Sequence, residues 1–165
     1  MWRLVVNCGV LWREVGDSGD PTEGQLMLGF VGQYQHTLDA KGRLILPARF
    51  RAEFERGGHL SPNTDGCVAL WTPGEFARQT EERLAQSRNG GATELQLARY
   101  WAANSSDVEF DKQGRFALPV STREYGQLEG DVLIVGSLDH IELWDPAIYD
   151  QKVNPAEAMF KQGNK

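Results

Sequence analysis

The sequence predicts a mainly β fold of the α+β class, built from two tandem copies of one small hairpin unit with short flanking helices. A nine-residue block recurs 72 residues further along the chain, a second block recurs at nearly the same spacing, and the apolar segments between turns are short. Each copy has about 45–50 core-forming residues, a size at which independent folding is marginal. We therefore expect the two copies to bury their apolar faces against each other as a pseudo-dimeric β-barrel.

The internal repeat is the main organising feature of the chain. The block Asp39–Pro47 (DAKGRLILP) recurs as Asp111–Pro119 (DKQGRFALP), with five of nine positions identical. Further along, VALWTP at 68–73 matches IELWDP at 141–146. Two blocks in the same order indicate a duplication.

Each copy of the first block predicts a tight hairpin turn. A three-residue hairpin loop needs a left-handed backbone conformation at its third position, and glycine adopts that conformation without steric cost. The turn glycines should therefore have positive φ, and their replacement by Val should cost roughly 1–3 kcal/mol. An aspartate and an arginine flank each turn as a cross-strand pair. The turn residues are Asp39, Gly42 and Arg43 in the first copy, and Asp111, Gly114 and Arg115 in the second.

The segments after each turn predict a strand, a proline stop and helices. The apolar run after each arginine favours a strand buried on both faces, as in a closed barrel. Residues 48–54 then predict a short helix, and 68–71 a strand. Thr72 is a candidate N-cap, with Pro73 at the first helical position and Glu75 completing a capping box. A second helix is expected at about 93–103, and Asp145 repeats the cap before Pro146.

These elements suggest four segments. Residues 1–26 read as a disordered leader or upstream extension, because they are rich in Gly, Asp, Thr and Pro and match neither copy. Met27, immediately before the first expected strand, is a candidate natural start. The first repeat spans 27–102, the second spans 103–150, and 151–165 form a loose tail.

Composition excludes several classes of protein. No apolar run reaches the roughly 18–20 residues that a membrane span needs, and the start of the chain lacks the pattern of a secretory signal. Cys8 and Cys67 make neither a disulfide framework nor a metal motif, and three scattered histidines lack metal-ligand spacing. We therefore expect a cytoplasmic protein with no metal, no cofactor and no catalytic residues. The net charge of −6 argues against nucleic acid only weakly, because local charge decides DNA binding.

At the two turns, Asp39-Ala-Lys-Gly-Arg43 and Asp111-Lys-Gln-Gly-Arg115, the sequence resembles the MraZ family. The resemblance covers Met27 to about Tyr149, and includes the glycine-containing opening from Met27 and the doubled Leu-Trp strand ends. It implies swapped-hairpin halves like those of the AbrB and SpoVT regulators. It also implies a ring-shaped homo-oligomer that binds repeated G-rich boxes on double-stranded DNA near the nucleoid. The implied role is mainly repression of the division and cell-wall gene cluster, including the regulator's own promoter.

The resemblance assigns DNA contact to the first turn, through Lys41 and Arg43, with Arg115 as the counterpart of Arg43. Arginine suits bidentate contact with guanine, whereas lysine suits phosphate contact. Arg49 and Arg51 are further candidates for phosphate contact, although an ordinary solvated helix face explains them equally well. Gln113 replaces the equivalent of Lys41, which puts the second turn's own DNA contact in doubt.

A charge count favours the first copy as the DNA reader, with the second mainly completing the fold. Residues 36–56 hold five basic and three acidic side chains, whereas residues 108–128 hold three of each. Two other classes stay open. One is an AbrB-like barrel serving as a protein-recognition or antitoxin module, and the other is a small barrel enzyme, for which no acid–base or nucleophile constellation is visible. Trp71 and Trp144 are expected in the core or at the barrel rim rather than stacked on bases.

Overall fold

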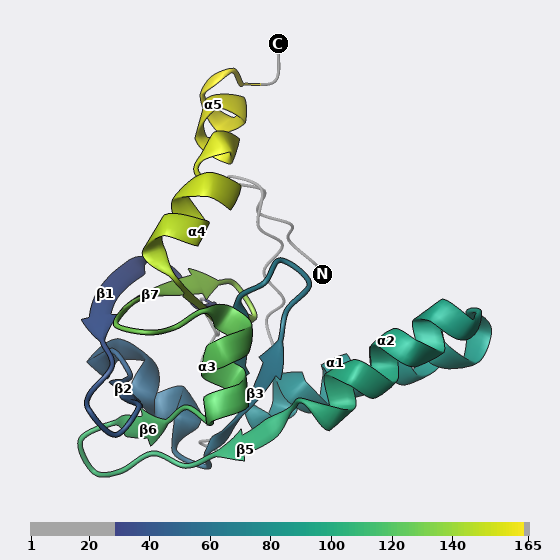
Figure 1. Ribbon diagram of the computed structural model, residues 1–165, viewed down its shortest axis with the longest axis horizontal. Coiled ribbons are helices and arrows are strands. Elements are labelled where there is room, and N and C mark those ends of the chain that lie inside the picture. Colours follow the sequence, from purple (N-terminus) through teal and green to yellow (C-terminus); the bar gives the residue numbers. More distant parts are fainter. Residues whose placement is uncertain (1–28, 164–165) are drawn as a thin grey trace, which may run out of the picture.

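The computed structural model describes residues 29–163, so the expected leader at 1–26 and the candidate start at Met27 lie outside the described residues (Figure 1). The elements of the first repeat are β1 (Gln33–Thr37), β2 (Arg43–Ile45), the 3-10 helix η1 (Ala48–Phe54), β3 (Gly58–Pro62), β4 (Val68–Trp71) and α1 (Pro73–Asn89). After α2 (Ala92–Ala103) come β5 (Ser106–Val108), β6 (Arg115–Ala117), α3 (Val120–Gly126), β7 (Asp131–Ser137), β8 (His140–Trp144), α4 (Pro146–Lys152) and α5 (Pro155–Lys161).

The two repeats have the same order of elements and exchange strands with each other. The six-stranded antiparallel sheet has the order β1-β7-β8-β4-β3-β5, and a separate two-stranded ribbon pairs β2 with β6. Exchanging the equivalent elements of the two repeats reverses this sheet order and leaves it otherwise unchanged. The first strand of each repeat therefore pairs with a strand of the other repeat. This is the pseudo-dimer that the duplication predicts.

One continuous core joins the sheet and the ribbon. The ribbon contributes Leu44 and Leu46, in and just after β2, and Phe116 and Leu118, in and just after β6. All four are buried against sheet residues such as Leu70. The end strands β1 and β5 of the sheet do not pair with each other, so strand pairing does not close these described residues into a barrel.

The apolar run after each arginine is not buried on both faces, contrary to the expectation from sequence. Leu44 and Leu46 are fully buried, but Ile45 between them is 40% exposed, and Ala117 of the partner strand is exposed as well. The ribbon covers the core with one face only, so its other face lies in solvent. Because Ile45 on that outer face is apolar, the sequence does not show the alternation of apolar and polar residues that is typical of a strand with one buried face.

The helices begin where their caps predict. Thr72 Oγ1 accepts the Glu75 amide at 3.4 Å, and Asp145 accepts the Ile148 amide at 3.0 Å. The Glu75 carboxylate, expected to complete a capping box, pairs instead with Arg78 at 2.7 Å. Residues 151–165, expected as a loose tail, include the end of α4 and the whole of α5.

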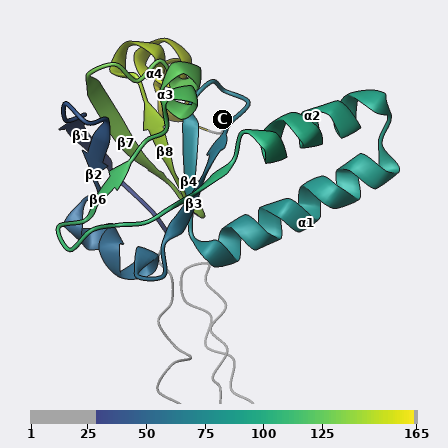
Figure 2. The ribbon, with the colours of Figure 1, turned by 60° about the horizontal axis from the view of Figure 1, so that its bottom comes forward.

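The helices α1 and α2 form a hairpin that projects from the sheet (Figure 2). The amphipathic pattern of α2 predicts a buried face, but only Trp101 is buried, while Leu97 and Tyr100 are 57% and 51% exposed. Leu84 of α1 is 46% exposed. The two helices pack mainly on each other, which leaves most of their apolar side chains outside the main core. No described helix has the length and apolar character that crossing a membrane requires.

Candidate nucleic-acid interface

The first turn is organised by the Asp39 carboxylate. Its Oδ1 accepts the amides of Lys41 and Arg43, both at 2.9 Å, and its Oδ2 accepts Nε of Arg43 at 2.7 Å. The backbone closes the loop, because the Asp39 amide donates to the Arg43 carbonyl and the Gly42 amide donates to the Asp39 carbonyl. The backbone amide of Arg43 and then its side chain hold the pKa of Asp39 below its usual value.

The second turn repeats this geometry atom for atom. Asp111 Oδ1 accepts the amides of Gln113 and Arg115 at 2.9 Å, and its Oδ2 accepts Nε of Arg115 at 2.7 Å. The Arg115 amide and side chain lower the pKa of Asp111 to about 2. Each aspartate therefore stays ionised and holds its arginine in one orientation, with both side chains about one-third exposed.

The turn glycines have the left-handed backbone that the sequence predicts. Gly42 has φ +70° and Gly114 has φ +77°. Both are buried, because a side chain from the other repeat covers each of them.

The pairing of β2 with β6 places both arginines on one exposed face. Arg43 lies opposite Ala117, and Arg115 lies opposite Ile45, so the two arginines are diagonal neighbours on the outer side of the ribbon. Such diagonal positions are about 7–8 Å apart in an antiparallel pair. The structure therefore brings both predicted arginines together on the face that also carries Ile45 and Ala117.

The remaining predicted basic residues lie in two different environments. Lys41 is exposed in the first turn, and Arg49 is exposed on η1, where its guanidinium donates to the Tyr34 hydroxyl at 2.8 Å. Arg51 is only partly exposed, and its Nε donates to the Leu46 carbonyl at 3.0 Å. Arg51 therefore does not belong to a simple solvated helix face.

Sequence reasoning missed two basic residues at the turns. Lys112 is exposed in the second turn, one position earlier than Lys41 in the first, and it supplies a lysine where Gln113 does not. Arg123, 72 residues after Arg51, covers Gly42, just as Arg51 covers Gly114. The signal was present in the sequence, because an arginine follows four residues after Pro47 and again after Pro119.

The basic residues at the two turns match, so the charge difference that favoured the first repeat lies outside the turns, in Arg49 and Arg56. Each turn combines one lysine, one arginine on the ribbon and one covering arginine from the other repeat: Lys41, Arg43 and Arg123 at the first, and Lys112, Arg115 and Arg51 at the second. The count along the chain placed Arg51 and Arg123 at their own turns, but exchanging one arginine for the other leaves each total unchanged. That the first repeat dominates binding stays a prediction.

Three other side chains that the sequence analysis considered are buried in the structure. Trp71 and Trp144 are 5% and 2% exposed, as expected for core residues. Cys67 is fully buried, and burial raises the pKa of its thiol, which makes it a poor nucleophile. In the part of the chain that the structure describes, no cluster of three His, Cys, Asp or Glu residues is arranged to hold a metal ion.

Fold and site together define a class: duplicated, strand-swapped proteins whose two halves present charged hairpin turns on one shared ribbon. Residues 29–98 and 102–165 each match the family model described as "MraZ protein, putative antitoxin-like". The chain belongs to the MraZ family of transcriptional regulators, which are not enzymes.

Three relatives illustrate the similarity. The chain is 34% identical over 133 residues to the transcriptional regulator MraZ of Desulforamulus reducens, covering 81% of this chain and 93% of that protein. The regulator of the same name from Kocuria rhizophila is 35% identical over 81% of this chain and 92% of its own length. The one from Mycoplasmoides gallisepticum is 38% identical, over 74% of this chain and 85% of that protein.

Proposed function

We propose that the protein is a sequence-specific DNA-binding repressor that reads repeated G-rich boxes through its two Asp-x-x-Gly-Arg turns. The proposal rests chiefly on Arg43 and Arg115, which lie on one exposed ribbon face, each held in place by an ionised aspartate. A guanidinium fixed in this way is prepared for bidentate hydrogen bonds to O6 and N7 of guanine. An exposed Arg–Asp pair contributes only about 0–1 kcal/mol to stability, so stability alone explains the repeated pair poorly.

The other contacts follow from position and charge. Lys41 and Lys112, at the tips of the two turns, are suited to phosphate contact, which positions the protein without reading sequence. Arg49, exposed beside the ribbon, and the terminal amino groups of Arg51 are further candidates for phosphate contact. These local cations explain how a chain with a net charge of −6 can approach DNA.

The biological setting follows from the family resemblance. The target is the division and cell-wall gene cluster, including the promoter of the regulator's own gene, and the protein works in the cytoplasm at the nucleoid. A ring-shaped homo-oligomer would engage several boxes at once, since one ribbon offers few cationic contacts and linked sites multiply affinity. Boxes spaced about 10 bp apart would lie on one face of the DNA.

The test is a titration of labelled DNA containing repeated G-rich boxes against a scrambled duplex, at several salt concentrations. Arg43→Ala should lose about 1–3 kcal/mol of specific binding free energy and relax selectivity at one guanine. Lys41→Ala should weaken both duplexes alike and reduce the salt slope by about one. Equal binding of boxed and scrambled DNA would contradict the proposal, and so would Arg43→Ala binding as tightly as the wild type.

Comparing Arg43→Ala with Arg115→Ala decides how the two repeats share the work. Equal losses would indicate a shared face, whereas a milder effect of Arg115→Ala would support dominance of the first repeat. An operator with a single box that binds as tightly as an array would exclude avidity, and a monomer at micromolar concentration would exclude the ring. A footprint upstream of the protein's own gene would locate the operator.

A protein-recognition module is the second candidate. The observation favouring it is the projecting α1–α2 hairpin, with Leu84, Leu95, Leu97 and Tyr100 each at least 40% exposed. An antitoxin-like role would use such a surface to bind a protein rather than DNA. The same DNA titration separates the two candidates, because a protein-recognition module would bind the boxed duplex no better than the scrambled one.

A further inference from the structure

Two arginines, Arg51 of η1 and Arg123 of α3, occupy equivalent positions in the two repeats, and each lies against the turn of the opposite repeat. Neither is fully exposed, and neither forms a salt bridge among the residues that the structure describes. Their placement therefore calls for a reason other than surface charge.

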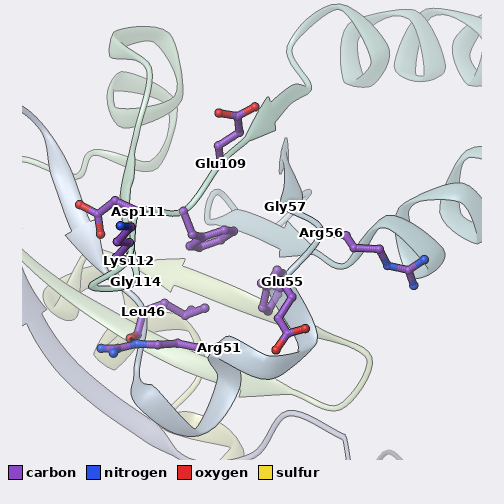
Figure 3. Close-up of a pocket in the computed structure, with 11 residues that line it drawn as sticks. Leu46, Arg51, Glu55, Arg56, Gly57, Glu109, Asp111, Lys112 and Gly114 are labelled. Atoms are coloured by element: carbon purple, nitrogen blue, oxygen red, sulfur yellow. Dashed lines mark hydrogen bonds between the residues drawn. The ribbon is translucent and has the colours of Figure 1, made fainter. Parts of the chain in front are cut away.

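Arg51 closes a short chain of contacts onto the second turn. A Cβ placed on Gly114 would overlap the Arg51 side chain, with Cδ at 2.8 Å and Cζ at 2.9 Å, so the guanidinium end lies directly over the glycine. Arg51 Nε also donates to the Leu46 carbonyl, and the Leu46 amide donates to the Gly114 carbonyl at 2.8 Å. Figure 3 shows Arg51 running beside Leu46 toward the turn that carries Gly114 and Asp111.

Arg123 makes the equivalent contacts with the first turn. The three heavy atoms nearest to a Cβ placed on Gly42 all belong to Arg123, at 3.0 to 3.2 Å. Arg123 Nε donates to the Leu118 carbonyl at 3.2 Å, and the Leu118 amide donates to the Gly42 carbonyl at 3.0 Å. The reciprocal arrangement leaves each turn held on one side by its own aspartate and on the other by the opposite repeat.

We propose that Arg51 and Arg123 are positioning residues, through which each repeat orders the DNA-reading turn of the other. The inference rests on the proposed function for its DNA consequence. Arg123 would act through the turn on Arg43, and Arg51 through the other turn on Arg115. The planar guanidinium matters as well as its charge, because it covers the glycine and donates in a fixed direction to a backbone carbonyl.

Double-variant cycles on the full-length protein test the crossed pattern with boxed DNA. Arg123→Ala should weaken specific binding by about tenfold, and combining it with Arg43→Ala should give a loss at least roughly threefold smaller than the product of the two single losses. Combined with Arg115→Ala, the losses should multiply. Arg51→Ala should show the reverse pairing, coupled to Arg115 and independent of Arg43. Arg99 is exposed on the projecting α2, so Arg99→Ala removes the same charge away from the turns. Its effect on binding should be independent of Arg43→Ala and of Arg115→Ala.

Lysine variants separate position from charge. Arg51→Lys and Arg123→Lys keep the positive charge but lose the planar guanidinium, so they should couple in the same crossed pattern as the alanine variants. If both lysine variants bind DNA like the wild type, charge alone explains the residues and the proposal is wrong. Multiplicative losses in all the pairs would also overturn it.

Amide hydrogen exchange measured by NMR on the free protein gives a readout that does not need DNA. Arg123→Ala should accelerate exchange at Lys41, Gly42 and Arg43, whose amides all bond to Asp39, while leaving the second turn unchanged. Arg51→Ala should do the opposite, at residues 113–115. Equal acceleration at both turns, or none, would overturn the inference. If the wild type ignores DNA while the crossed exchange pattern holds, the proposed function fails and the positioning role stands.

Discussion

Replacing Gly114 by Ala tests the packing of the second turn more sharply than any other single change. An L-residue with φ near +77° costs about 1–2 kcal/mol. The new Cβ would also displace Arg51 and its hydrogen bond to Leu46, which costs about 0.5–1.5 kcal/mol. Gly114→Ala should therefore lower the free energy of unfolding by about 1.5–3.5 kcal/mol.

Two other glycines provide matched comparisons. At Gly42 the nearest Arg123 atom is 3.0 Å from the new Cβ and can move by a few tenths of an ångström, so Gly42→Ala should cost only the backbone strain, about 1–2 kcal/mol. Gly74, near the start of α1, has no atom within 4 Å of the new Cβ. Gly74→Ala should be neutral or stabilise the protein by up to about 1 kcal/mol.

Urea unfolding followed by tryptophan fluorescence gives all three values on one scale. The expected order of stability is Gly74→Ala, then Gly42→Ala, then Gly114→Ala. If Gly114→Ala stays within about 0.5 kcal/mol of the wild type, Arg51 does not pack against the turn as described. A larger loss for Gly42→Ala than for Gly114→Ala would refute the same reasoning.

Three further predictions concern the core and two titrating groups. Leu44→Ala, at a fully buried ribbon position, should cost about 2–5 kcal/mol yet keep one cooperative transition, and separate fluorescence and circular-dichroism midpoints would contradict the interlocked fold. Burial alone would lower the pKa of His140, but the carboxylates of Glu142 and Asp139 raise it above its usual value. His140 should therefore stabilise the protein below about pH 6.5 and lose this effect as pH rises through its folded pKa, so the stability difference between wild type and His140→Gln should shrink as pH rises above about 6.5. Asp111, with a lowered pKa, should stabilise the protein above about pH 4 and lose this effect as pH falls toward 2, so Asp111→Asn should differ from the wild type at pH 5 but converge with it near pH 2.

The sequence was sufficient for the local features of the fold. A glycine three positions after an aspartate determines a left-handed turn, because few other residues tolerate that backbone. The Thr72 and Asp145 caps followed from the residues that accept amides at helix starts. The strand at 68–71 and both helices of the projecting hairpin were also placed correctly, because their signals lie within one segment.

Local signals did not identify the partners of those segments, although the family resemblance implied swapped hairpins. The turn at 39–43 indicates that the chain reverses, but not that β1 then pairs with β7 while β2 pairs with β6. The contacts of Arg51 and Arg123 follow from this exchange, since each arginine lies near its own repeat in sequence and beside the other in space. The sequence was misleading at Ile45 for a related reason. Its apolar side chain lies on the outer face of the ribbon, so the segment lacks the alternation of apolar and polar residues that indicates one buried face.

The exchange of strands also bears on how the chain folds during synthesis. Gln33 pairs with Val135, so β1 waits for a partner translated about 100 residues later. At ribosomal rates of roughly 5–20 residues per second, that delay is about 5–20 s. During it, the nascent first repeat exposes the unpaired edges and apolar faces that β6 and β7 later cover. The exchange of strands joins the two repeats of the finished protein into one unit. During synthesis, the same exchange leaves the first repeat prone to aggregation until the second is made, and a chaperone would bind it in this interval.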